Sequence, residues 1–326
     1  MTFSLAAPVR VEKLGLLAPS APPVTIRTVT LETSPDGTTF TPIQGVQLKP
    51  TDEIQWFDAA IPSARYVRVT VGEGGSSLAT LQSVHVRGEW LQPPSVAPIA
   101  DCWAVNETTG NFAERGGRVA AWLDTAPEKT QLDGGRFGAV YRFAWARGPQ
   151  WGLGLITLSP DGKRLTGMKW HELGGGHAFS TSWFGERRSC APAGMQPDIV
   201  VDTFLRRAGW YPLFSLHFDE KDAVVEQASG EAFGIIENIV RGLPSQRIRL
   251  AAREYHESTP EANRRRAETR LRTLRDALTK RGLDLSRVDF APLGADEPRI
   301  AIPTEAMRVM HGTVEIQVAP DGRSAF

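Results

Sequence analysis

The hydrophobic pattern of this chain changes once, and that change limits the folds open to it. In residues 1–90, apolar and polar residues alternate, which predicts half-buried β-strands, and residues 102–190 run as strands and turns. After about residue 205, apolar residues also recur at helical spacing. At 326 residues, the chain is long enough for two or three domains. The sequence therefore predicts a multidomain, mostly β protein with a C-terminal α/β module.

The first predicted domain, residues 1–90, reads as an antiparallel β-sandwich. Its clearest strand is YVRVTV at 66–71, and SPDG at 34–37 has the chemistry of a turn between two strands. The runs LETSPDGTTFTPI, IPSARYVRVTV and LQSVHVRGEW resemble the later strands of discoidin-like (coagulation-factor type C) domains. That resemblance implies a carbohydrate-binding sandwich. It transfers no functional residue, because the family binds its ligands at loop tips that this segment does not identify.

The second predicted domain, residues 99–192, follows a proline-rich linker and holds six of the nine tryptophans. Its strands and turns predict a meander or a small β-barrel, since closure removes exposed strand edges. Cys102 and Cys190 stand at its two ends. We predict that they form a disulfide, which indicates an oxidising compartment. Two unrelated buried thiols are the alternative.

No catalytic or metal site is predicted in this middle domain. His171, Glu172 and His177 superficially resemble a zinc peptidase helix. The two histidines, however, are six residues apart instead of four, with three glycines between them. Nucleophile-elbow and phosphate-binding motifs are absent from the sequence as well. We therefore expect no catalytic residue, no metal and no cofactor.

The third predicted domain, residues 205–320, has the element order βαβαββ, with two helices on a mixed sheet. Thr259 and Pro260 are favourable as the N-cap and first residue of its second helix, and Gly282 is favourable at its end. The predicted strands are 213–218, 248–252, 288–291 and 313–318, and the predicted helices are 233–243 and 260–281.

This third domain resembles a known family. The runs SLHFDEKDAVV, RIRLAAREY, NRRRAETRLRTLRDALTKRGLDLSRV and GTVEIQV are similar to the OmpA-like C-terminal domain, a peptidoglycan-binding module also found in Pal lipoproteins and flagellar stator proteins. In that family an Asp after the second strand and an Arg in the next helix clamp the diaminopimelate of the peptide stem.

The resemblance can be carried over only in part. Arg270 falls on the clamp Arg, and Asn263 falls on the Asn at the start of the helix. Tyr255 stands at the Asp position, and it cannot neutralise an ammonium group near pH 7. Glu254 or Glu257 would replace the missing carboxylate after a small loop shift. The resemblance thus implies a degenerate peptidoglycan pocket.

The charge balance and the hydropathy limit the classes of partner that the sequence predicts. Lys plus Arg and Asp plus Glu number 37 each, so no global field draws the chain to nucleic acid or to a membrane surface. Acidic residues interrupt the arginine-rich helix face at 261–276, and no aromatic residues interleave, which indicates a solvated face without nucleic acid. No apolar run approaches the roughly 20 residues of a membrane-spanning helix, and the N-terminus lacks a signal-peptide pattern.

These features predict a non-enzymatic attachment or scaffolding protein in the periplasm or at the surface of a Gram-negative bacterium. The expected partners are peptidoglycan or another envelope glycan, bound weakly, and other envelope proteins. One alternative is a subunit of a larger assembly that uses the OmpA-like fold for protein contacts. A glycan-acting enzyme is the other, and it lacks a paired-carboxylate signature.

Overall fold

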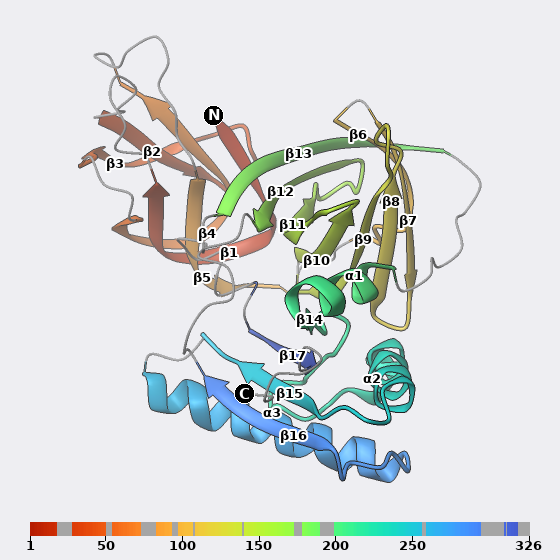
Figure 1. Ribbon diagram of the computed structural model, residues 1–326. Helices are drawn as coiled ribbons and strands as arrows, with labels where there is room; N and C mark the ends of the chain where they lie inside the picture. Colours follow the sequence, from red (N-terminus) through yellow and green to blue (C-terminus); the bar gives the residue numbers. More distant parts are fainter. Residues whose placement is uncertain are drawn as a thin grey trace. The chain divides into compact units, whose positions relative to one another are not determined.

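The protein is described from a computed structural model (Figure 1). The described residues are 1–17, 28–49, 54–72, 83–92, 97–106, 108–138, 140–172, 178–189, 199–255, 259–294, 310 and 312–318. They form a mostly β chain with several sheets and three α-helices, which confirms the predicted fold class. The chain divides into two compact units, one built mainly from Met1–Ala97 and the other mainly from Pro98 onward.

The first unit is one antiparallel sheet with the strand order β3-β2-β4-β1-β5. Its strands are β1 (Thr2–Leu17), β2 (Thr28–Ser34), β3 (Thr41–Gln47), β4 (Gln55–Val71) and β5 (Ser83–Trp90). The pairing of β1 with β4 shifts register between Ser4 and Lys13, and such bulges bend long strands. A single core cluster takes side chains from along both long strands. The predicted turn at 34–37 is present, with Gly37 at φ 80°.

The second unit begins with a closed barrel of eight consecutive antiparallel strands (Figure 1). They are β6 (Asp101–Val105), β7 (Thr108–Arg115), β8 (Arg118–Leu123), β9 (Thr130–Phe137), β10 (Val140–Arg147), β11 (Gln150–Leu158), β12 (Arg164–Glu172) and β13 (Ala178–Arg188). The last strand pairs with the first, so the meander closes as the sequence predicts. Four of its tryptophans are buried, and these are Trp103, Trp145, Trp170 and Trp183.

Arg187 on β13 contacts the residues at the start of β6. Its Nη1 donates to Asp101 Oδ2 at 3.0 Å, and its Nη2 donates to the carbonyl oxygen of Pro98 at 2.6 Å. The guanidinium carbon lies 4.7 Å from the centroid of the Trp103 ring. These contacts hold the segment that enters β6 against the last strand.

The predicted disulfide involves one residue outside the described ranges. Cys102 is buried on β6, where Arg188 is its partner across the ladder with β13. Cys190 follows Arg188 by two residues and lies outside the described residues. The disulfide therefore stays a prediction. Comparing the free-thiol content of the denatured protein before and after reduction tests it directly.

The C-terminal module has a four-stranded sheet of order β14-β17-β15-β16. Its elements after the short helix α1 (Ile199–Ala208) are β14 (Trp210–Pro212), α2 (Gly230–Gly242), β15 (Ile248–Arg253), α3 (Pro260–Lys280), β16 (Val288–Gly294) and β17 (Thr313–Val318). Because β15 and β16 are parallel and the other pairs antiparallel, the sheet is mixed. The predicted order βαβαββ is confirmed.

Two local predictions in this module need correction. The first strand is Trp210–Pro212, whereas 213–218 was predicted. Leu213, Phe214 and Leu216 are buried core residues in a turn, and their apolar run has the composition of a strand without its backbone. The helix α1 was not predicted at all. It packs beside β14, and Phe204 makes edge contacts with neighbouring aromatic rings.

The barrel and the C-terminal module share a core. One cluster contains Ala144 and Leu153 from the barrel, Phe204 from α1 and Ile316 from the sheet. The predicted domains 99–192 and 205–320 both fall within this one compact unit.

The β7–β8 hairpin of the barrel makes close contact with the C-terminal module. Gly117, at φ 81°, lies in the β7–β8 hairpin, and a Cβ there would stand 2.0 Å from the carbonyl oxygen of Ala228. His217 Nε2 is 3.2 Å from the carbonyl oxygen of Gly117. Glu231 on α2 accepts a hydrogen bond from Arg115 Nε at 2.8 Å. The hairpin is thus held against the module by backbone and side-chain contacts.

Candidate functional site

The predicted ligand site lies where α3 passes the end of β15. Thr259 caps α3, because its hydroxyl accepts a hydrogen bond from the Ala262 amide at 3.2 Å. Arg270 follows on the buried side of the helix beside Leu271, and only 6% of its surface is exposed. Helix phase therefore places the Arg270 guanidinium toward the sheet, as the sequence predicts.

Two carboxylates hold the Arg270 guanidinium. Its Nε donates to Asp222 Oδ1 at 2.8 Å, and its Nη1 donates to Glu254 Oε1. The Phe218 ring lies against it, with 4.9 Å between the guanidinium carbon and the ring centroid. A carboxylate of a peptide stem would have to displace these groups to reach the same donors.

Strand alternation explains why Glu254 faces Arg270. Ile248, Leu250 and Ala252 share a core with the buried face of α3, so even-numbered positions of β15 point toward that helix. Glu254 continues this face. Glu254, which the sequence offered as a replacement for the missing Asp, and Asp222 therefore supply the carboxylates that accept from Arg270.

Asp222 is a partner that sequence reasoning missed. It lies in the loop after Phe218 at φ 58°, and its carboxylate also accepts from Arg266 Nε at 3.0 Å. Its carbonyl oxygen accepts a hydrogen bond from the Thr273 hydroxyl at 2.9 Å. The acidic run DEKD at 219–222 was the only trace of this partner in the sequence. It gave no indication of which helix the run contacts.

Asn263, the other predicted site residue, is engaged within its own helix turn. It is buried, and its Nδ2 donates to the Thr259 carbonyl oxygen at 3.0 Å. Tyr255 is half-buried just beyond β15, and Glu257 lies outside the described residues. Of the four residues predicted for the pocket, the structure brings Arg270 and Glu254 into direct contact.

Glu254 is fully buried, with 0% of its surface exposed. Its Oε2 has no hydrogen-bond partner among the described residues. Burial raises the pKa of Glu254 to about 7, and the neighbouring Arg270 opposes that shift only in part. The carboxyl group is thus poised to change charge near neutral pH.

This raised pKa makes folding stability depend on pH. The ordinary pKa is 4.5, so the folded protein holds the Glu254 proton more tightly than the unfolded chain. The resulting stabilisation is complete at low pH and is lost as pH rises toward 7. Relative to Glu254→Gln, the wild-type unfolding free energy should fall by about 1–3 kcal/mol between pH 5 and pH 8. Denaturant unfolding at several pH values measures this difference, and a constant difference would contradict it.

The barrel adds a third cation to the cluster, which the sequence did not indicate. Arg142 on β10 is 3% exposed, and its Nη1 donates to the Gly312 carbonyl oxygen at 3.0 Å. Its guanidinium lies between the rings of Phe137 and Phe214, at 4.5 and 4.9 Å from their centroids. Burial, and then the charge of Arg270, lower the pKa of Arg142 to about 9. Arg270, at the clamp position, therefore belongs to an interior ion network to which both the barrel and the module contribute.

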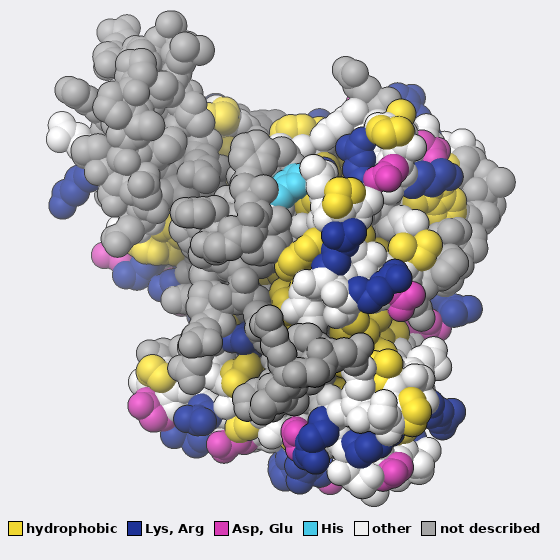
Figure 2. Space-filling view, in the orientation of Figure 1, with side chains coloured by type: hydrophobic (Ala, Val, Ile, Leu, Met, Phe, Trp, Pro, Cys, Tyr) yellow, Lys and Arg dark blue, Asp and Glu magenta, His cyan; other side chains and the backbone are white. Residues whose placement is uncertain are grey.

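The exposed side of α3 carries charges of both signs. Arg264, Arg265 and Arg272 alternate there with Glu261 and Glu268. Figure 2 shows dark blue and magenta side chains intermixed on the module's surface. Such a mixture is typical of a solvated helix face.

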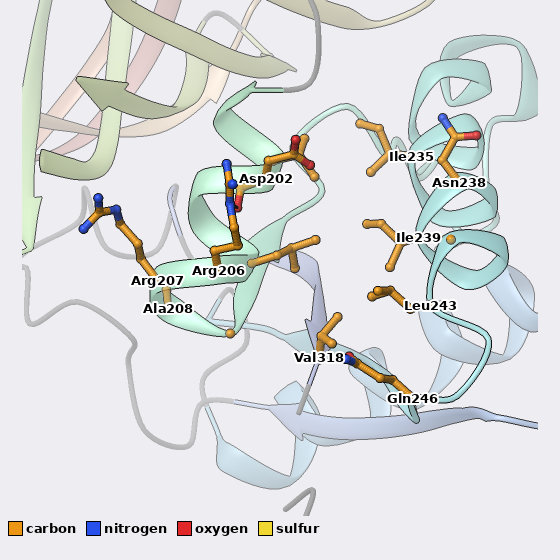
Figure 3. A pocket seen from close by; sticks show the side chains of 14 residues that line it. Asp202, Arg206, Arg207, Ala208, Ile235, Asn238, Ile239, Leu243, Gln246 and Val318 are labelled. Atoms are coloured by element: carbon orange, nitrogen blue, oxygen red, sulfur yellow. Dashed lines mark hydrogen bonds between the residues drawn. The ribbon is translucent and has the colours of Figure 1, made fainter. Parts of the chain in front are cut away.

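A separate groove of about 750 Å³ lies between α1 and α2, with Val318 of β17 at its base (Figure 3). Ile235, Ile239 and Leu243 project into it from the α2 side. Asp202 and Arg206 line it from α1. This volume is in the range of small-ligand sites.

The described residues contain neither a cluster of metal ligands nor a membrane-spanning helix. Within those ranges, no three His, Cys, Asp or Glu side chains come together as metal ligands. His171 lies on β12 in edge contact with Trp145, and His177 is outside the described residues. No described helix is both long and apolar enough to cross a membrane.

No family model and no curated protein matches the sequence. Similar solved structures include the C-terminal domain of a chitobiase from Bacteroides fragilis, 22% identical over 28% of this chain and 63% of that one, with TM-score 0.27. CBM32-1 from a family 31 glycoside hydrolase of Clostridium perfringens is 15% identical over 26% of this chain and 66% of that one, with TM-score 0.25. This chain thus spans less than two-thirds of either structure.

The third similar structure is the OmpA-like domain of FopA1 from Francisella tularensis. It is 13% identical over 52% of this chain and 81% of that one, with TM-score 0.27. The structures similar to this chain thus include an OmpA-like domain and carbohydrate-binding domains, at low TM-score and partial coverage.

Proposed function

We propose that this chain is a non-enzymatic attachment or scaffolding protein of a Gram-negative cell envelope, in the periplasm or at the cell surface. Its C-terminal module is proposed to keep an OmpA-like fold while binding peptidoglycan weakly or not at all. The N-terminal unit is proposed to contact an envelope carbohydrate. We assign no catalytic residue and no cofactor.

The observation that carries this proposal is the engagement of Arg270. Both Asp222 and Glu254 accept from its guanidinium, and Glu254 is wholly buried. A ligand could bind Arg270 only after these charged hydrogen bonds within the protein were broken, so its own contacts would have to offset that loss. An interior ion network of this kind supports a structural use of the fold over ligand capture.

A second observation favours the alternative of an assembly subunit. The module already packs on a protein surface, because the β7–β8 hairpin sits against Ala228 and His217. A fold that buries one face on protein within its own chain is suited to protein contacts. In this alternative, the partners are other envelope proteins.

Co-sedimentation with purified peptidoglycan sacculi tests the proposal on the full chain. We expect most of the protein to stay in the supernatant, and excess soluble muropeptide should not change the pelleted fraction. An OmpA-like domain with both clamp residues serves as the positive control. Saturable sedimentation at micromolar protein that muropeptide competes away would overturn the proposal. Release of soluble muropeptides into the supernatant would support an enzyme instead.

A further inference from the structure

A second cluster of basic and aromatic side chains lies inside the barrel, away from the Arg270 network. On β10, Ala144 and Ala146 belong to the core shared with the C-terminal module, so Trp145 between them faces the barrel interior. Its indole Nε1 donates to the carbonyl oxygens of Leu153 and Trp170, both at 3.2 Å. The ring is therefore fixed in place.

Lys169 on β12 points to the same interior. Its Nζ lies 4.9 Å from the centroid of the Trp145 ring and 5.9 Å from that of Trp183. Both rings are buried, while Lys169 itself is half-buried. The ammonium group thus lies beside two buried aromatic rings.

The charged residue that acts most on Lys169 is basic. Arg147 at the end of β10 is close enough to lower the pKa of Lys169, after the larger effect of burial. His171 follows two residues later on the same face, and its ring centroid is 4.6 Å from that of Trp145. Among the described residues, no Asp or Glu forms an ion pair with Lys169.

Lys129 provides an internal comparison. It too lies over a tryptophan, with its Nζ 5.9 Å from the Trp122 ring centroid. Unlike Lys169, it has a carboxylate partner, since Asp124 Oδ1 is 3.1 Å from the Nζ. A barrel lysine over a tryptophan therefore does not by itself exclude a counter-ion in this protein. Lys169 has no such carboxylate partner among the described residues.

We propose that this end of the barrel binds a small organic carboxylate, whose anionic group pairs with Lys169. Lys169 and Arg147 favour an anion there, although Arg147 Nη2 also donates to the Ala126 carbonyl oxygen at 2.6 Å. The tryptophan walls reduce the screening of the pair by water. Mouths of β-barrels are common places for such ligands. The site is separate from the Arg270 network, so it stands or falls independently of the proposed envelope role.

Ligand-observed NMR titration of the full chain with benzoate tests this site. Benzoate should bind saturably, and benzyl alcohol, its uncharged analogue, should bind at least about tenfold more weakly. Lys169→Met should weaken benzoate binding by about tenfold or more, whereas Lys129→Met should leave it unchanged. Thermal melting of both variants checks that they remain folded.

Three results would overturn the proposal. The first is an absence of saturable benzoate binding below about 10 mM, which would leave Lys169 satisfied by its aromatic contacts alone. The second is equal binding by wild type and Lys169→Met. The third is equal loss in both lysine variants, since that would indicate general charge attraction.

Discussion

Arg270→Met should destabilise the protein by about 3–5 kcal/mol, because it leaves the buried Glu254 without the cation that holds it and Asp222 with Arg266 alone. Methionine keeps most of the side-chain volume, so the loss reports on charge more than on packing. Chemical denaturation of the full chain measures it. Arg272→Met on the exposed face of the same helix is the matched control, and its effect should stay within about 0.5 kcal/mol.

A second variant separates the ion network from a general effect at this position. Adding Glu254→Gln to Arg270→Met removes the stranded buried carboxylate, so the double variant should recover a large part of the lost stability. Additive losses in the two variants would show that Arg270 and Glu254 do not interact energetically. The direct contact between them would then be irrelevant to stability.

Gly117→Ala should cost more than about 3 kcal/mol, because its Cβ would stand 2.0 Å from the carbonyl oxygen of Ala228 and 2.7 Å from His217 Nε2. The clash is with the C-terminal module, so barrel and module should lose stability together. Gly116→Ala is a close control in the same hairpin. It has φ 53°, and a Cβ there would stand 3.5 Å from the Glu231 Cγ.

The control isolates the clash from the backbone effect. Both glycines have positive φ, so both alanine variants should lose about 1 kcal/mol of folding stability because alanine disfavours a left-handed backbone. Only Gly117→Ala adds steric overlap. Equal melting temperatures for the two variants would contradict the tight junction between the hairpin and the module.

Local patterns in the sequence were enough to predict most elements of the fold. Alternation in YVRVTV reflects one buried face of β4, and Val67 and Val69 are buried in the folded structure. The start of α3 was predictable because Thr259 and Pro260 act within one helical turn. These features depend on neighbours along the chain, which the sequence shows directly.

Features that depend on distant contacts were not predictable. Asp222 pairs with Arg270 across 48 residues, and nothing near Asp222 specifies that helix. Arg142 reaches the same network from the barrel, 170 residues from its acceptor at Gly312. The helix α1 was missed because it is only 10 residues long and gains its stability from aromatic packing. The family resemblance predicted the location of Arg270 and offered Glu254 as a replacement carboxylate, whereas Asp222 and Arg142 could not be predicted.

Calorimetric titration with a diaminopimelate-containing muropeptide tests the central claim, that interior carboxylates have replaced the ligand at Arg270. Two proteins are compared, the wild type and the double variant Glu254→Thr with Tyr255→Asp, which frees Arg270 Nη1 and supplies the family's Asp. The missing counter-charge for the ligand ammonium is worth about 2–5 kcal/mol, or roughly 30- to several-thousand-fold in affinity. We predict that only the double variant binds measurably. Micromolar binding by the wild type, lost in Arg270→Met, would contradict the claim.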